Sequence, residues 1–262
     1  MNYSSGLEYI VGSPYLNNSY SNVNYFSKNI DDNYNFKGDD SIISEKQYAG
    51  NSIRQPQYKN QQQYSTIYSA LHAFTPEFFL KPSRPKTRFI DDNHEIRSIA
   101  EETFELMMKV KLPESISINI LPFEEFKSIH SRFGAWNNGI LGFSLNGTEK
   151  NIFVRENHLD ALMLVVGHEI GHVLTETLPN KHDEEAKAFA FSIEWTHTIK
   201  KHNIANLGLS IKDKIDFQPA RNGLHDIAFG FVDFMVKKGR KAIEVHDDLV
   251  KRYTSVFNRV YF

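Results

Sequence analysis

The chain of 262 residues contains no cysteine. This absence excludes a disulfide framework, an iron–sulfur cluster, a cysteine zinc ribbon and a thiol nucleophile. Any metal site in this sequence must therefore be built from histidine, aspartate and glutamate side chains.

The sequence also lacks long apolar runs and an excess of charge of either sign. Its longest strongly apolar stretch, residues 159–167, is too short to span a bilayer and contains Asp160. The first residues, MNYSSGLEYIVGS, have neither the basic nor the apolar region of a cleaved signal peptide. Thirty Lys and Arg stand against 32 Asp and Glu, so no basic surplus is available to neutralise nucleic-acid phosphates. We therefore expect a cytoplasmic protein with no nucleic-acid or membrane partner.

Tyrosine is distributed unevenly and divides the chain into two parts. Ten of the 12 tyrosines lie within residues 1–68, where apolar residues are scattered without a helical or strand period. Such a segment cannot bury enough apolar surface to offset its ordering entropy. We expect residues 1–85 to form a low-complexity arm that ends in a linker containing Pro76, Pro82 and Pro85. The arm is either disordered or a pro-segment, and it could bind its own cleft or a protein partner.

Residues 86–262 have the patterns of a folded α+β domain. Apolar periodicity predicts a helix within residues 91–110, and an alternating strand follows at residues 115–121. A hairpin is predicted within residues 139–155, where Asn146-Gly147 suits a type I′ turn. The domain is therefore expected to contain a small twisted sheet.

A long helix is predicted after the hairpin, with Asn157 as its N-terminal cap. Gly167 and Gly171 lie inside this helix, where glycine is destabilising, so they indicate close approach of a neighbouring element. The later pattern stays helical. We expect the sheet and this helix in residues 86–178 and a helical subdomain in residues 179–262.

The long helix contains the HExxH sequence His168-Glu169-Ile170-Gly171-His172. Two imidazoles four residues apart lie on one face of a helix, about one turn from each other, so both can reach one tetrahedral zinc ion. Glu169 lies beside that face, where it can take a proton from water instead of binding the metal. The motif predicts one zinc ion per chain with a glutamate general base.

Such a site needs a third protein ligand. The metzincin pattern fails, because Thr175 and Leu178 occupy the positions of its later glycine and histidine. The alternative is a carboxylate on the next helix, as in sites with two histidines and one glutamate. Asp183, Glu184 and Glu185 all lie near the start of that helix, and each is a candidate.

The order helix, strand, helix, hairpin, HExGH helix and acidic helix resembles the compact gluzincin metallopeptidases, especially the archaeal minigluzincins and the ImmA/IrrE-type peptidases. The resemblance covers about residues 91–198. It implies a zincin-like fold in which His168 and His172 bind zinc and Glu169 is the general base. It also implies that a glutamate at the head of a Glu-x-x-Ala helix is the third ligand.

Two registers of this third ligand follow from the resemblance. Glu185-x-x-Ala188 fits the Glu-x-x-Ala form, and Glu185 is the ligand that we expect. Asp183-x-x-Ala186 matches the ImmA/IrrE-like spacing better, but it offers aspartate, and Asp183 is also a natural helix N-cap. Glu184 is the third choice.

These features predict a gluzincin-type, zinc-dependent metalloendopeptidase that hydrolyses peptide or protein substrates. In zincins of this type an extended substrate adds to the edge strand of the hairpin, and His225 or Tyr253 could stabilise the oxyanion. The alternative from another class is a non-catalytic, zinc-stabilised protein whose Tyr/Asn-rich arm mediates assembly or partner binding. A third hypothesis combines the two, as a latent peptidase whose arm covers the cleft.

Overall fold

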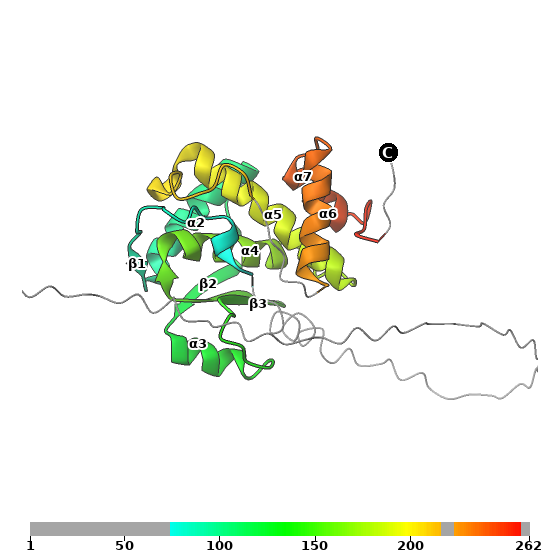
Figure 1. Ribbon diagram of the computed structural model, residues 1–262. Helices are drawn as coiled ribbons and strands as arrows, with labels where there is room; N and C mark the ends of the chain where they lie inside the picture. Colours follow the sequence, from blue (N-terminus) through cyan, green and yellow to red (C-terminus); the bar gives the residue numbers. More distant parts are fainter. Residues whose placement is uncertain (1–73, 216–222, 258–262) are drawn as a thin grey trace, which may run out of the picture. The chain divides into compact units, whose positions relative to one another are not determined.

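The computed structural model describes residues 74–215 and 223–257. These residues form an α+β fold with six α-helices and a small mixed sheet, which confirms the predicted fold class at this level (Figure 1). The predicted low-complexity arm, up to residue 73, lies outside the described residues. Within them, no helix is long and apolar enough to cross a membrane.

The described elements come in the following order along the chain. They are η1 (Pro76–Phe78), β1 (Phe89–Ile90), α2 (Asn93–Met108), β2 (Ile116–Leu121), α3 (Phe123–His130), β3 (Gly142–Asn146), β4 (Lys150–Arg155), β5 (Asn157–His158), α4 (Leu159–Val173), α5 (Lys181–His202), η2 (Ile204–Asn206), α6 (His225–Lys237) and α7 (Ala242–Val250).

The main sheet has three strands in the order β2-β4-β3. Strand β2 runs parallel to β4, and β3 is antiparallel to β4 and forms an edge. The alternate residues Ile116, Ile118 and Ile120 of β2 are buried in the core, as the alternating sequence predicts. Helix α4 lies on one side of the sheet and α3 on the other (Figure 1).

Helix α4 is the central element of the fold. It packs against β3 and β4 on one side and against α5 on the other, and nearly all of its residues are buried, as expected for a helix that is apolar all round. A Cβ atom added at Gly167 would lie 2.4 Å from the ring of Trp195, and one added at Gly171 would lie 2.9 Å from Cα of Ala188. Both contacts are with α5, so the close approach predicted from these glycines is confirmed.

Two predictions about local structure are wrong. The turn is not a two-residue loop at Asn146-Gly147, because Asn146 still pairs with Lys150 and three residues form the loop. The side-chain amide of Asn146 is used elsewhere, since it donates to the carbonyl oxygen of Thr175 at 2.7 Å. Asn157 does not cap α4: it belongs to β5, which pairs with β1, and His158 takes the N-cap position without a side-chain hydrogen bond.

The chain from Phe74 to Arg84, which composition groups with the linker, packs against the body in the structure. Phe79 and Leu80 are completely or almost completely buried in the main core. Arg84 forms an ion pair with the buried carboxylate of Asp160 at the start of α4. This segment is therefore held against the helix that carries the HExxH sequence.

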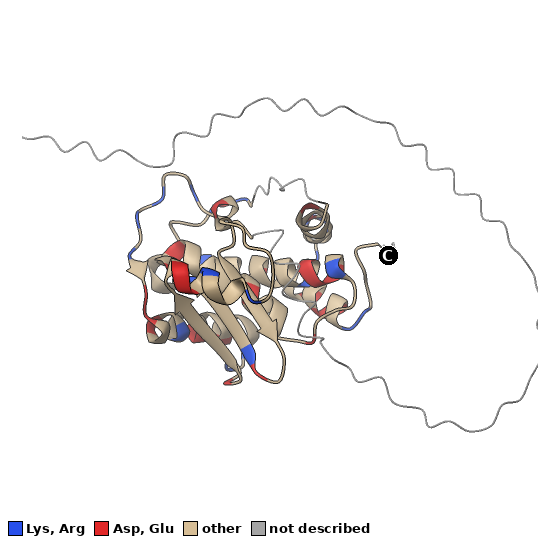
Figure 2. Ribbon diagram, turned by 90° about the horizontal axis from the view of Figure 1, so that it is seen from below, with Lys and Arg blue, Asp and Glu red and all other residues tan. Residues whose placement is uncertain are grey.

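The C-terminal helices pack on α5. Helices α6 and α7 both contact α5, and they also contact each other. Figure 2 shows acidic and basic residues interspersed along the helices of the described chain. The packing of α6 on α5 positions the start of α6 beside the start of α5, where His225 approaches Glu185.

Candidate metal centre

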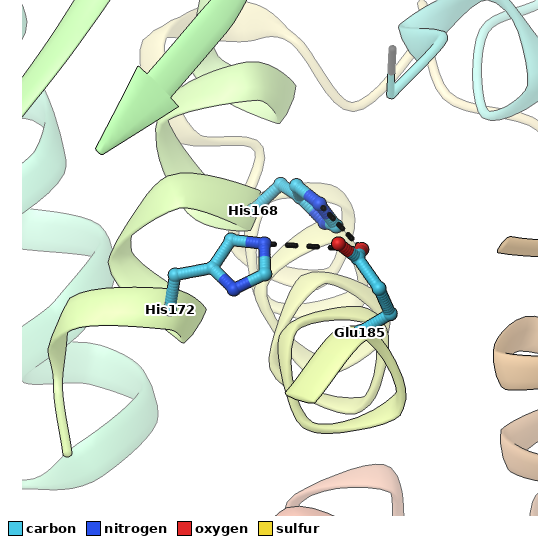
Figure 3. A group of neighbouring side chains, drawn as sticks. All are labelled: His168, His172 and Glu185. Carbon is cyan, nitrogen blue, oxygen red and sulfur yellow. Dashed lines mark ion pairs between the residues drawn. The ribbon is translucent and has the colours of Figure 1, made fainter. Parts of the chain in front are cut away.

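His168 and His172 of α4 face Glu185 of α5 (Figure 3). Their side chains offer three ligand atoms that all lie within 4.8 Å of one another. The Oε2 atom of Glu185 lies 3.7 Å from Nε2 of His168 and 3.9 Å from Nε2 of His172. This group could hold a metal ion.

The two separations from Glu185 are close to those around a small divalent cation. Bonds of about 2.0–2.2 Å in a tetrahedral site place neighbouring ligand atoms about 3.3–3.6 Å apart. The distances from Glu185 to the two imidazoles, 3.7 and 3.9 Å, exceed that value by only a few tenths of an ångström. Two imidazole nitrogens and a carboxylate oxygen are also the ligand types that zinc accepts.

Hydrogen bonds to Nδ1 of both histidines direct the opposite ring nitrogen, Nε2, toward Glu185. Nδ1 of His168 lies 3.2 Å from the hydroxyl oxygen of Ser192, which donates its own proton to a carbonyl of α5 and so accepts from the imidazole. Nδ1 of His172 donates to the carboxylate of Glu184 at 2.9 Å. Such partners fix the orientation of metal-binding imidazoles and raise their basicity.

The three consecutive carboxylates have separate partners. Asp183 accepts hydrogen bonds from the hydroxyl of Ser255 and the backbone N–H of Val256, so it holds the C-terminal segment. Glu184 accepts from Nδ1 of His172, and only Glu185 joins the two imidazoles in the group of ligand atoms. Of the three candidates that the spacing leaves open, the structure places Glu185 in the group that could hold a metal ion.

Glu169 lies beside the ligand atoms, and it is not part of the group that could hold a metal. Its side chain is 4% exposed and accepts a hydrogen bond from Ser144 of the edge strand β3. Burial raises the pKa of Glu169 to about 7, although the charge of His172 opposes this shift. A carboxylate with this pKa can accept and release a proton near neutral pH.

The two predicted oxyanion donors lie in different places. His225, the first residue of α6, is buried, and its Nε2 lies 3.0 Å from Oε2 of Glu185. Tyr253 lies in the turn after α7 and its side chain is 68% exposed. Of these two residues, the structure brings His225 to the group that could hold a metal ion.

The charges around the centre differ between the two imidazoles. Burial and the positive charge of His172 hold the pKa of His168 well below its usual value. Burial also lowers the pKa of His172, but the hydrogen bond to Glu184 and the charge of Glu185 outweigh it and raise this pKa to about 9. Although burial favours its neutral form, the charges of His225 and His172 lower the pKa of Glu185 below its usual value. Without metal, His172 is thus the protonated member of the group at neutral pH.

No family model matches the chain, and no curated protein or solved structure matches it. The functional evidence is therefore the arrangement of side chains described above.

Sequence reasoning missed the residues that support the ligands. Ser192 lies seven residues after Glu185, two helical turns along the same face of α5, and this spacing could have indicated a partner for an imidazole. Ser144 and Gly142 are two residues apart in β3, so their positions lie on the same face of the strand, toward α4. This period could have indicated the contact of Ser144 with Glu169. Lys187, which is completely buried, gives no comparable signal, because a lysine on a helix is usually exposed.

Proposed function

We propose that the protein is a zinc-dependent metallopeptidase of the gluzincin type, with one zinc ion per chain held by His168, His172 and Glu185. The observation that carries the proposal is the convergence of these three side chains beside a buried glutamate, Glu169, that does not take part in the ligand group. Two imidazoles and one carboxylate are a known catalytic zinc ligand set, which leaves a further coordination position open.

The chemistry is divided between the metal and Glu169. A zinc ion bound there would supply a Lewis acid that polarises the scissile carbonyl and makes water more acidic. Glu169 accepts the proton of the attacking water at its carboxylate and passes it to the leaving amine. The hydrogen bond from Ser144 orients this carboxylate. His225 supplies a buried imidazole at the same centre, where its Nε2 lies 3.0 Å from Oε2 of Glu185 and holds this proposed ligand.

The edge strand β3 is the proposed binding site for the backbone of a peptide or protein substrate. In the described sheet β3 pairs with β4 on one side only, so its other edge is available for an added strand. Ser144 of β3 contacts Glu169, and Gly142 packs closely against the same glutamate, since an added Cβ atom would lie 3.1 Å from its Oε1. A substrate on this edge would therefore lie close to the general base.

The variant Glu169→Gln tests the mechanism. It retains the shape of the side chain but cannot take a proton, so we expect zinc binding to be kept and peptide cleavage to fall by about 10²–10⁴-fold. Cleavage is measured on a mixed peptide library, and zinc content by metal analysis of the purified protein. The control is Glu125→Gln, an exposed glutamate of α3, which should cleave like the parent. A Glu169→Gln protein as active as the parent would rule out this role.

The burial of the centre favours a second candidate, a non-catalytic, zinc-stabilised protein whose N-terminal arm mediates assembly or partner binding. Two of the three proposed ligands, His168 and Glu185, are only 3% and 6% exposed, as in a closed structural site. This candidate predicts a large fall in melting temperature on chelation of zinc, because the metal's binding energy contributes to folding. It also predicts that no peptide is cleaved by the zinc-loaded protein, and any cleavage that Glu169→Gln abolishes would exclude it.

A further inference from the structure

Lys187 is a buried lysine at the junction between the two helices that carry the proposed ligands. Its side chain is 0% exposed, and its Nζ atom is the donor in three contacts. It donates to the carbonyl oxygens of His172 and Glu176, each at 3.2 Å, and it lies 2.9 Å from Oε2 of Glu184. An ammonium group has three donors, so this set uses all of them and compensates for the loss of hydration.

The three contacts of Lys187 join structures on both sides of the connection between α4 and α5. The carbonyl of His172 belongs to the last turn of α4, where carbonyl groups have no partner within the helix and a cation is favourable. Glu176 lies in the connection itself. Glu184 lies in the first turn of α5, and it also accepts the backbone N–H of Leu178 at 2.7 Å. Lys187 therefore links the end of one ligand-bearing helix to the start of the other.

The same carboxylate connects Lys187 to a proposed ligand. One oxygen of Glu184 faces Lys187, and the other accepts the hydrogen bond from Nδ1 of His172. The ammonium group thus fixes the carboxylate that fixes the imidazole ring. We propose that Lys187 is a positioning residue of the metal centre, which holds Glu184 against His172 and sets the separation of α4 and α5 at the ligands. The inference rests on the metal site of the proposed function.

A role in packing alone predicts a different outcome from a role in positioning. Removing one member of a buried ion pair leaves the other charge without its partner and destabilises the fold. A role in packing alone therefore lowers the melting temperature but leaves the zinc affinity of the folded protein unchanged. Methionine has a similar length to lysine and would fill the space that Lys187 occupies. It would leave Glu184 without its cation, and the ring of His172 would lose the support of a fixed acceptor.

The experiment compares the full-length protein and its Lys187→Met variant, using zinc and cobalt ions alone as probes. We expect the variant to bind zinc at least tenfold more weakly in a chelator competition, the loss typical of removing a partner of a metal ligand. The visible absorption bands of bound cobalt, which depend on coordination geometry, should also shift. The melting temperature of the metal-free variant should also fall, because Glu184 loses its buried partner, so zinc affinity is compared at a temperature at which both proteins are folded. Zinc affinity within twofold of the parent, with an unchanged cobalt spectrum, would overturn the proposal.

A second variant covers the case in which Lys187→Met does not fold. Glu184→Gln keeps the volume and an acceptor for His172 but removes the charge that binds Lys187. At a pH above about 9, where His172 is neutral in both proteins, it should also bind zinc at least tenfold more weakly. If both variants fold, the loss of zinc-binding free energy in the double variant should be smaller than the sum of the losses in the two single variants, because both substitutions remove the same contact. Glu184→Gln with the parent's zinc affinity and cobalt spectrum would contradict the proposal.

Lys237→Met is the matched control. Lys237 is an exposed lysine of α6 paired with Asp233 at 2.6 Å, with 74% of its side chain accessible, so its replacement should leave zinc affinity and the cobalt spectrum unchanged. None of these measurements needs peptide cleavage. A protein that binds zinc but cleaves no peptide would refute the proposed peptidase activity, while the zinc affinity of Lys187→Met would still decide the role of Lys187.

Discussion

A shift of one residue along α5 decides which carboxylate can face the two histidines, as shown by Asp183, Glu184 and Glu185. Each residue of an α-helix is rotated by about 100° from the one before, so three neighbours point in three directions. The sequence narrows the third ligand to these carboxylates, but the choice depends on the elements around α5. The partner of Asp183 is 72 residues later in the chain, in the segment at Ser255. No local pattern could have indicated that contact, and this contact holds Asp183 away from the proposed metal centre.

Zinc binding should be coupled to the loss of one proton from His172. The raised pKa of about 9 means that the metal-free protein carries imidazolium at this position below that pH, whereas metal binding requires the neutral ring. His168, whose pKa is lowered, and Glu185, whose pKa is also lowered, are already in the form that binds metal. The apparent zinc affinity should therefore rise about tenfold per pH unit between about pH 7.5 and 9 and then level off.

Calorimetric titration of the metal-free protein with zinc, in buffers of different ionisation enthalpy, measures the released proton directly. About one proton per zinc is expected at pH 8. The control is Glu184→Gln, which removes the hydrogen-bonded charge that contributes to the raised pKa of His172 and should release a smaller fraction of a proton. A zinc affinity that does not change between pH 7.5 and 9 would show that His172 is not the protonated ligand.

At the scale of elements, the packing of α4 on α5 sets the geometry of the site. Gly171→Ala should destabilise the fold, because the new Cβ atom would lie 2.9 Å from the Cα atom of Ala188, which is backbone and cannot rotate away. Overpacking of this kind costs about 1–3 kcal/mol of unfolding free energy. It should also move α4 from α5 and weaken zinc binding, since the ligands come from both helices.

Gly230→Ala is the matched control for this prediction. Gly230 lies in α6, and an added Cβ atom would meet no other atom within 4 Å. Alanine has the higher helix propensity, so this variant should gain about 0.5–1 kcal/mol. Chemical denaturation of metal-free proteins compares the two. Equal effects of both substitutions would show that glycine at position 171 is not required by close packing.

The order and type of the longer elements could be read from the sequence because they depend on local periodicity, whereas the two-residue strands β1 and β5 were not predicted. The helix predicted within residues 91–110 and the strand at residues 115–121 occur as α2 and β2. The details that failed depend on distant partners. Asn146 precedes a glycine as in a type I′ turn, but its side-chain amide donates to the carbonyl oxygen of Thr175, just after α4. Asn157 pairs with β1, almost 70 residues earlier in the chain, instead of capping a helix.

At the scale of the whole molecule, composition misplaces the edge of the body. Proline and scattered charges make residues 75–90 resemble a linker, yet Phe79 lies in the core. The reason is that tertiary contacts hold this segment. Arg84 forms an ion pair with the carboxylate of Asp160, and Leu80 forms an isolated antiparallel β-bridge with Ile211. A segment of this kind gains its order from contacts with distant elements, which a local pattern does not contain.

The position of Phe74 gives the predicted arm a testable relation to the metal centre. Phe74 is the first described residue, and its ring stacks on the imidazole of His168 with 4.4 Å between centroids and 15° between planes. The described chain therefore begins beside a proposed ligand. If the arm makes the peptidase latent, deletion of residues 1–70 should increase both the rate at which a chelator removes zinc and the rate of peptide cleavage.

The two measurements separate the hypotheses for the arm. Faster zinc loss together with faster cleavage is expected of an arm that covers the cleft, because the deletion leaves Phe74 and the ligands in place and removes the chain before them. Loss of assembly without a change in zinc loss would instead support an arm that binds a partner. The melting temperature of both proteins in the metal-free state serves as the control, since a destabilised body would also release zinc faster. Unchanged zinc loss and cleavage in a deletion variant of equal stability would exclude latency through the arm.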